Sequence, residues 1–356
     1  MKHADDTTGG MSRFETPAGA MARRRLLAGL LFGLAGFVAL AGATPIQAAS
    51  FDCAKATHQN EKLICDTPEL SAKDDALAAA YDSALAALSE KGQEQLRTSQ
   101  RSWLRYWPMV CFEGKDIFGR EMPDSNDPAA CALAEYERRI SQLSNAVQRH
   151  EPYVFLLTHI YTAGELGGIN YTIVPSLTLD APADETAYAF DTQARHWIRK
   201  LRLLTQAGDG VSARDTIEIY AQEGTFVGLE GSAYQYNQGA AHGGTDVGFL
   251  NFILDDSTVL DADKLFLTDT DWATFLVTQA RQQLDERLGA DAYWPRNLTL
   301  KQVSDPEYWK LTPKGFTISF PLYSIGPYAM GIQSVEFPWD ALQPYLAPTA
   351  PAFTQK

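Results

Sequence analysis

The chain has 356 residues, of which 45% are hydrophobic and 11% aromatic, and this length and composition indicate a folded, globular protein with room for two domains. Acidic residues outnumber basic ones by 44 to 30, so the formal net charge is −14. Such a charge disfavours nucleic acids and anionic membranes as partners and favours encounter with cationic proteins. It would also suit an exported protein that is simply soluble.

The N-terminal residues have the architecture of a secretory signal peptide. Three consecutive arginines precede an apolar run over residues 26–43, and small residues follow near position 48. The run is short for a retained anchor, so we expect no stable membrane insertion after signal removal. The arginines also allow a twin-arginine export route. We therefore expect residues 1–48 to be leader and signal peptide, and the mature protein to be periplasmic or secreted. Three methionines are possible starts: Met1, Met11 and Met21.

Removal of the leader would make the protein more acidic. Residues 1–48 hold five of the 30 basic and three of the 44 acidic residues, which leaves 25 basic against 41 acidic. Most of the excess lies in residues 151–356, where 13 basic residues face 25 acidic ones.

All four cysteines lie in the first part of the mature chain, and an even number in an exported segment indicates disulfides. They do not form a C-x-x-C pair, so we expect no zinc site and no thiol redox motif. Three pairings are possible. We expect the sequential one, which closes two short loops: Cys53–Cys65 and Cys111–Cys131.

Residues 49–150 are expected to form a small all-α domain stapled by these disulfides. Apolar residues recur at helical spacing after Ser71, the expected N-cap of a first helix. A second helix should end near Pro108, and a third should begin with Asp127 as N-cap and Pro128 as first residue. None of the polar residues in this segment converge in the way that catalysis would require.

Several stretches of this segment resemble the N-terminal domain of the LprI lysozyme-inhibitor family. They include "FDCAKATHQNEKLIC", "LRTSQRSWLRY" and "CALAEYERRISQL", and the resemblance covers residues 51–143. The stretch between Cys111 and Cys131 is longer than the family pattern leads one to expect. The resemblance implies binding to lysozyme rather than catalysis.

Residues 151–350 are expected to form an α+β domain with a mixed, largely antiparallel sheet and two main helices. The helical stretches are "DETAYAFDTQARHWIRKLRLL" and "WATFLVTQARQQLDERL", the second with candidate N-caps at residues 269–271. The expected strands alternate apolar and polar residues: "YVFLLTHIYT", "YTIVPSLTLD", "DTIEIYAQ", "TFVGLEGSAYQY", "DVGFLNFIL" and two more in "GFTISFPLYSIGPYAMGIQSVEFPWDAL".

This second segment is similar to the extracytoplasmic domain of RsiV, a membrane anti-sigma factor whose ectodomain binds lysozyme. The stretches "AAHGGTDVGFLNFIL" and "KGFTISFPLYSIGPYAMG" bear the resemblance, which extends over about residues 153–346. In RsiV a sigma-binding segment and a membrane span precede this domain, whereas here a signal peptide and the helical segment do. The resemblance therefore implies lysozyme binding without anti-sigma activity.

His242, in the stretch "GAAHGGTD", has three possible roles. A metal site would need further ligands, but the other histidines form no H-x-H, H-E-x-x-H or H-x-x-x-H spacing with it. A general base would need acidic partners, for which Glu218, Glu223 and Asp246 are the candidates. The structural interpretation is a local hydrogen bond in a turn where Gly239, Gly243 and Gly244 permit positive φ. We favour it, and expect no catalytic residue, metal or cofactor.

The favoured function is therefore an exported protein that binds, and inhibits, a cationic lysozyme or another cell-wall-active enzyme. The alternatives are a peptidoglycan-directed hydrolase that uses His242 and the three carboxylates, and an envelope structural or sensor module without inhibitory activity. The "SIGPYAMG" stretch lacks the register of a phosphate loop and is expected to form a turn. The candidate partner-binding residues lie in residues 112–130, in the 239–245 turn and in this stretch: Phe112, Phe118, Gly239, His242, Gly243, Gly244 and Tyr328.

Overall fold

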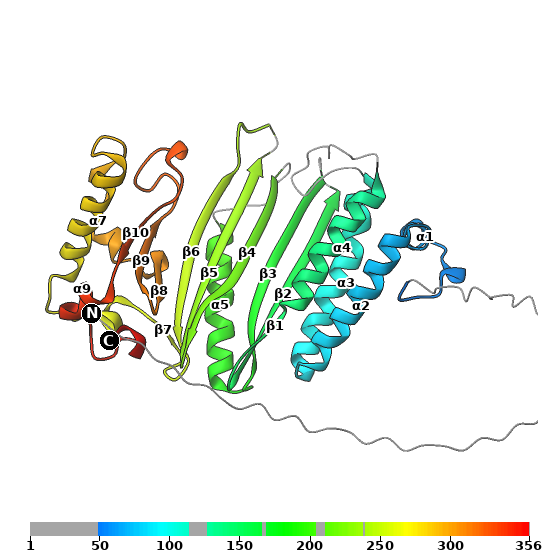
Figure 1. Cartoon of the computed structure of the whole chain (residues 1–356), viewed down its shortest axis with the longest axis horizontal. Coiled ribbons are helices and arrows are strands. Elements are labelled where there is room, and N and C mark those ends of the chain that lie inside the picture. Colours follow the sequence, from blue (N-terminus) through cyan, green and yellow to red (C-terminus); the bar gives the residue numbers. More distant parts are fainter. Residues whose placement is uncertain (1–48, 114–126, 166–168, 204–210, 238, 356) are drawn as a thin grey trace, which may run out of the picture. The chain divides into compact units, whose positions relative to one another are not determined.

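The computed structural model contains a helical N-terminal region followed by a large mixed sheet (Figure 1). The expected signal peptide, Phe118 and most of the 112–130 segment lie outside the described residues. None of the helices in the part that is described is long and apolar enough to cross a membrane. The structure describes residues 49–113, 127–165, 169–203, 211–237 and 239–355.

The N-terminal region is helical, as the sequence predicts. The Ser71 cap is wrong: the helix begins at Pro68 after Thr67, because proline suits the first helical position, and Ser71 lies buried inside it. The third expected helix begins as predicted, and the Asp127 side chain accepts from the N–H groups of Ala129 and Ala130. The elements are η1 (Cys53–Lys55), α1 (Gln59–Asp66), α2 (Pro68–Ala86), α3 (Glu90–Glu113) and α4 (Pro128–Ser144).

Aromatic packing and two disulfides hold these helices together. Trp103 and Trp107 on α3 are almost fully buried, and each meets the Tyr136 ring of α4 edge-on, at centroid distances of 5.0 and 5.6 Å. Cys53 pairs with Cys65, and Cys111 with Cys131, the sequential arrangement. The second bridge joins the end of α3 to the start of α4, so these two helices are tied at both ends of the long connection between them.

The second region is built on a seven-stranded mixed sheet in the order β1–β2–β3–β4–β5–β6–β7. All neighbouring pairs are antiparallel except β3 and β4, which are parallel. β1 and β7 are short strands that the sequence patterns did not predict. The strands are β1 (Val147–His150), β2 (Tyr153–Glu165), β3 (Ile169–Ala181), β4 (Val211–Glu223), β5 (Phe226–Asn237), β6 (Gly244–Ile253) and β7 (Thr258–Val259).

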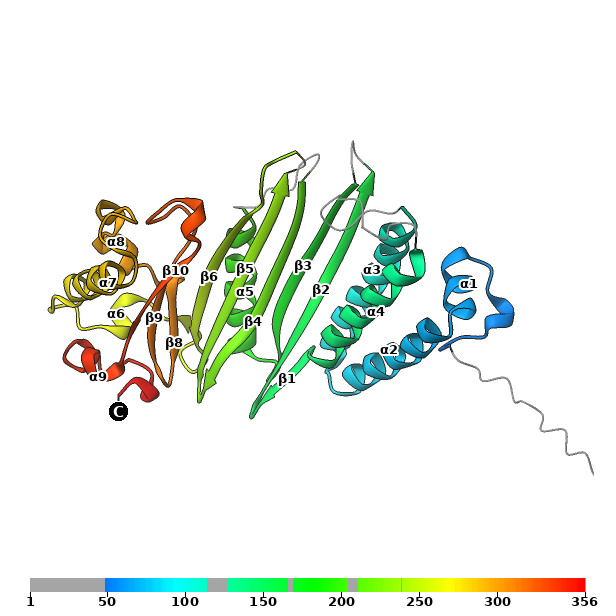
Figure 2. The ribbon, with the colours of Figure 1, turned by 45° about the horizontal axis from the view of Figure 1, so that its top comes forward.

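Helix α5 (Glu185–Leu203) connects the two parallel strands and lies on one face of the sheet, as Figures 1 and 2 show. A crossover helix is what a parallel connection requires. Gly231 of β5 and Gly248 of β6 are paired, and the side chains of Trp197 and Leu201 on α5 lie against them. A Cβ at Gly231 would stand 2.7 Å from Trp197, so the two glycines make the flat surface on which the indole rests.

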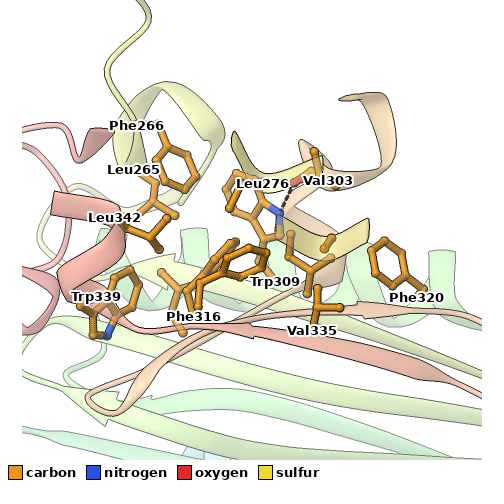
Figure 3. Packing of buried hydrophobic residues seen from close by; sticks show 14 of the residues in the cluster. Leu265, Phe266, Leu276, Val303, Trp309, Phe316, Phe320, Val335, Trp339 and Leu342 are labelled. Carbon is orange, nitrogen blue, oxygen red and sulfur yellow. Dashed lines mark hydrogen bonds between the residues drawn. The ribbon is translucent and has the colours of Figure 1, made fainter. Parts of the chain in front are cut away.

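A second, three-stranded antiparallel sheet in the order β10–β9–β8 follows, with helix α7 as the other main helix. Its core gathers Trp309, Phe316 and Phe266, all fully buried (Figure 3). The Trp309 indole N–H donates to the carbonyl of Val303 at 2.8 Å, so its polar atom is satisfied inside this core. The elements are α6 (Ala262–Leu265), α7 (Trp272–Leu288), η2 (Pro295–Asn297), α8 (Leu300–Val303), η3 (Pro306–Tyr308), β8 (Trp309–Thr312), β9 (Gly315–Phe320), η4 (Tyr328–Met330), β10 (Gln333–Phe337), α9 (Trp339–Leu342), η5 (Gln343–Tyr345) and η6 (Ala352–Thr354).

Helix α3 packs along the edge of the large sheet beside β2 (Figures 1 and 2). Strand β1 pairs with β2 only as far as Leu156, which leaves the rest of that edge without a strand partner. Ser99 donates to the carbonyl of His159 at 2.7 Å, and Ser102 accepts from the N–H of Tyr161 at 3.1 Å. The helix thus satisfies backbone groups that an open edge would expose.

Candidate functional site

The turn between β5 and β6 holds His242 against a loop from the second sheet. The imidazole is stacked on the Tyr328 ring of η4, with centroids 3.8 Å apart and planes 17° from parallel. Its Nδ1 lies 3.0 Å from the carbonyl oxygen of Gly243, to which it donates in the tautomer protonated at Nδ1. The local hydrogen bond expected from the sequence is present, and the stacking onto Tyr328 adds a long-range contact.

The three glycines of this turn differ in backbone conformation and in the space that a side chain would have. Gly239 alone adopts positive φ, at 85°. Gly243 and Gly244 do not use the positive φ that glycine permits. At Gly243 the reason is close approach, because a Cβ would stand 2.2 Å from the hydroxyl of Tyr234, whereas at Gly244 nothing lies within 4 Å.

A shallow pocket of about 230 Å³ opens beside this stacked pair. Tyr323 is its most prominent wall: the side chain is 55% exposed and lies 6.0 Å from the Tyr328 ring. Its φ of 62° is a left-handed conformation that bulky residues seldom adopt, and such strain is concentrated at binding and catalytic sites. The other walls are Gln235, Asn237, His242, Gly243, Gly244, Asp246 and Tyr328.

A larger groove of about 420 Å³ adjoins the pocket and shares Asp246 and Tyr323 with it. Trp197 and Leu201 of α5 form an apolar floor, and both are more than nine-tenths buried. Asp246 on β6 and Tyr308 on η3 stand at its sides. We call the two hollows together the α5–β6 groove.

Carboxylates dominate the electrostatics of this groove. Lys200 is engaged by Glu307 at 2.5 Å, and Asp305 accepts from the N–H of Glu307 at 3.1 Å. Within the described chain Asp246 has no hydrogen bond or ion pair, and burial raises its pKa because no cation offsets the loss of water. Burial and the neighbouring carboxylates raise the pKa of Tyr308, which keeps its phenol neutral at physiological pH.

The arrangement does not assemble the alternative catalytic set. Glu218 is opposite Glu230, which is opposite Phe249, so these three share one face of the sheet, and Asp246, three residues from Phe249, points to the other face. Glu223 lies in the β4–β5 hairpin, at the far end of β5 from His242. Only Asp246 of the three proposed carboxylates lines the pocket with His242.

No group of three His, Cys, Asp or Glu side chains that could hold a metal ion occurs in the described ranges. One imidazole stacked on a phenol, beside one half-buried carboxylate, offers aromatic and charge–charge contacts to a protein or peptide.

The predicted partner-binding residues fall into two places. His242, Gly243 and Gly244 line the pocket together with Tyr328, although Tyr328 is far from them in sequence, whereas Gly239 lies in the same turn outside the pocket lining. Phe112 lies elsewhere, at the end of α3, where its ring is 6.3 Å from that of Trp107. Phe118 is outside the described residues.

Sequence reasoning missed Trp197 and Tyr308 as parts of the site, and placed Asp246 only in the catalytic alternative. Trp197 lies on the buried face of a predicted helix, so its spacing indicates core packing alone. The facing glycines Gly231 and Gly248 were the available signal, because paired glycines in adjacent strands mark a close approach by a bulky group.

Comparison with known proteins identifies two segments of the chain. Residues 53–149 match the family described as Lysozyme inhibitor LprI, and residues 263–340 match the family described as Protein of unknown function (DUF3298). No curated protein matches the chain.

Two crystal structures are similar. One is a DUF3298 family protein from Pseudomonas aeruginosa PAO1, with a TM-score of 0.43 and 17% identity over 56% of this chain and 96% of that chain. The other is a DUF3298 family member from Bacteroides fragilis, with a TM-score of 0.43 and 16% identity over 56% of this chain and 95% of that chain.

The segment that resembles RsiV in sequence, residues 153–346, contains the DUF3298 match. The chain therefore joins a segment of the LprI lysozyme-inhibitor type to a segment of the DUF3298 type, in the order that the sequence resemblances predict.

Proposed function

We propose that this protein is an exported binder and inhibitor of a cationic lysozyme or another cell-wall-active enzyme. The observation that carries the proposal is the match of residues 53–149 to the lysozyme inhibitor LprI family. Two disulfides lie in that segment, and disulfides persist in oxidising compartments outside the cytoplasm. A periplasmic or secreted location, with residues 1–48 as leader, is part of the proposal.

Charge supports a cationic partner. Residues 151–356 hold 25 acidic and 13 basic side chains, so a basic enzyme would be attracted before contact. Charges at the rim of an interface mainly raise the association rate, whereas buried contacts set the dissociation rate. The acidic surface would therefore speed encounter, and a structured site would hold the complex.

The β5–β6 turn is the element we assign to contact with the enzyme. It stands at one end of the sheet, and its histidine is exposed on one side while Tyr328 supports the other. A turn braced in this way can enter a substrate cleft without losing much conformational freedom on binding. Residues 49–150 and 151–350 are the two functional segments in this proposal.

A turnover assay tests the proposal directly. The mature protein, added to a cationic c-type lysozyme with peptidoglycan, should lower the rate of wall hydrolysis, and a complex should elute early from a sizing column. His242→Ala should weaken inhibition about 3- to 10-fold, since it removes one exposed stacked ring, while Tm stays nearly unchanged. Glu218→Gln, which alters an exposed residue on the opposite sheet face, is the matched control.

The result that would overturn inhibition is unchanged turnover at every ionic strength together with no complex. Hydrolysis of peptidoglycan by the protein alone, abolished by His242→Ala, would instead establish the hydrolase alternative. Complex formation without loss of turnover would leave a binding protein and remove the inhibitory part of the proposal.

A further inference from the structure

The α5–β6 groove combines an apolar floor with an unpaired carboxylate. Trp197 is 4% exposed and Leu201 7%, so the floor of the groove is made of buried apolar side chains. The groove above the floor is open and measures about 420 Å³. Asp246 faces this space half-buried and without a hydrogen bond or ion pair to any described residue. A carboxylate in such a place loses hydration without compensation from the protein itself.

The charge balance of the groove calls for a cation. Among the described residues that line the groove, Asp246, Asp305 and Glu307 face one ammonium, that of Lys200, which is already bonded to Glu307 at 2.5 Å. The pKa of Tyr308 is raised partly by these three carboxylates, which indicates that their negative potential converges on the phenol. A positively charged group in the groove would be attracted by the carboxylates that the protein leaves uncompensated.

The walls favour arginine over lysine. A guanidinium is planar, weakly hydrated and able to stack on aromatic faces, whereas an ammonium is compact and strongly hydrated. Three aromatic side chains, those of Trp197, Tyr308 and Tyr323, line the groove together with the carboxylate of Asp246. Guanidinium groups bind such aromatic and acidic surroundings through cation–π contacts and charge-assisted hydrogen bonds.

We propose that the α5–β6 groove is the receptor for one arginine side chain projecting from the cationic partner enzyme. The side chain's aliphatic stem lies along Trp197 and Leu201, and its guanidinium bonds the carboxylate of Asp246. The inference rests on the proposed function for the identity of the partner, and deepens it by naming the contact that sets the dissociation rate.

Asp246→Asn tests the groove in the complex with a cationic c-type lysozyme. The substitution keeps the shape and removes the charge, so affinity should fall about 10- to 100-fold, mainly through faster dissociation. The loss should persist at 0.3 M salt, because a pair shielded from water is screened less than an exposed one. The matched control is Asp263→Asn, which removes an exposed carboxylate on α6, and it should change affinity less than about twofold.

A second measurement does not depend on lysozyme. N-acetyl-arginine amide should shift the indole N–H resonance of Trp197 saturably in an NMR titration, and its neutral isostere N-acetyl-citrulline amide should not. The shift should disappear in Asp246→Asn. Assignment of the resonance follows from its loss in Trp197→Phe.

The outcomes separate the two proposals. If wild type binds lysozyme, Asp246→Asn matches Asp263→Asn and arginine amide gives no shift, the groove proposal is wrong while lysozyme binding stands. If wild type does not bind lysozyme but arginine amide shifts Trp197, the groove recognises arginine and the proposed partner is wrong. Loss of both signals in Asp246→Asn alone supports the whole inference.

Discussion

Arg139 shows how a single buried residue organises the helical region. Its side chain is 1% exposed, and it donates to Gln100 at 2.9 Å and to Ser99 at 3.0 Å, both neutral acceptors. Its guanidinium also lies 5.6 Å from the centroid of the Tyr161 ring on β2. A buried cation held by neutral oxygens and a ring costs desolvation, so it fixes the geometry of its neighbours more than it adds stability.

Arg139 also acts on His159, and this interaction leads to a prediction about how stability depends on pH. Burial, followed by Arg139, Arg138 and Arg214, lowers the pKa of His159 from 6.5 to about 3. Below pH 6.5 this histidine is protonated in the unfolded chain but stays neutral in the folded protein. The free energy of unfolding therefore decreases as the pH is lowered from 6.5 to about 3.

His159→Gln should remove this loss, which is worth about 2 kcal/mol at pH 5. Urea unfolding at pH 7.5 and pH 5 measures it. If wild type and variant lost the same free energy of unfolding between these two pH values, His159 would not be the source of the pH dependence.

At the scale of elements, helix α3 occupies the place of a further strand beside β2. Two successive outward-facing N–H groups of the strand edge find partners on this helix: that of His159 donates to the hydroxyl oxygen of Ser99 at 3.3 Å, and that of Tyr161 to the hydroxyl oxygen of Ser102 at 3.1 Å. Serines three residues apart lie on one helix face, which matches the two-residue repeat of a strand edge closely enough for both bonds. The sheet is therefore closed on this side by a helix.

Ser102→Ala should expose this dependence. Without its hydroxyl the N–H of Tyr161 is left unpaired, at a cost of about 1–3 kcal/mol in the free energy of unfolding. Amide hydrogen exchange at Tyr161 should quicken as well. Ser83→Ala, which alters an exposed serine on α2, should change neither quantity, and equal behaviour of the two variants would show that the edge does not need the helix.

At the scale of the whole molecule, the helical region is bonded to the large sheet and to its crossover helix α5. Asp180 of β3 accepts from the N–H of Ser89 at 2.9 Å and from its hydroxyl at 2.5 Å, just before α3 begins. Lys91 on α3 forms an ion pair with Asp191 on α5 at 2.9 Å. Residues 47–356 form one compact unit, in agreement with these bonds.

Gly92→Ala should therefore weaken both segments at once. A Cβ at Gly92 would stand 2.3 Å from the carboxylate of Asp180, so this carboxylate and its bonds to Ser89 must shift. The shift should lower the free energy of unfolding by about 1–3 kcal/mol. Thermal unfolding should remain one transition at a lower Tm. Gly244→Ala is the matched control, because nothing lies within 4 Å of that position and its φ is not positive. Two separate transitions would contradict the coupling.

Local patterns were sufficient for most elements. Helix α5 was expected from Asp184 to Leu204 and spans Glu185–Leu203, because its apolar spacing is helical over the whole stretch. The short strands β1, β7 and β8 were missed, since two to four residues contain too little periodicity to predict a strand. Ser71 was misread as a cap because a serine before an apolar run looks the same whether it begins a helix or lies inside one.

The site was less predictable. His242 and its glycines were singled out from their sequence, but Tyr328 became their neighbour only through the packing of η4 on the β5–β6 turn. The carboxylates Glu218 and Asp246 seemed equally suitable in sequence. Strand register placed them on opposite faces of the sheet, and a one-residue change in register would have reversed that.

The sequence by itself determined the acidic charge, the order of the two segments and the main helices and strands. These depend on composition and on residues close together in the chain. The tertiary structure alone decided that α3 closes the edge of β2 and that Trp197, Asp246 and Tyr308 surround one groove. These contacts join residues tens of positions apart, and they form only when packing, pairing register and burial are satisfied together.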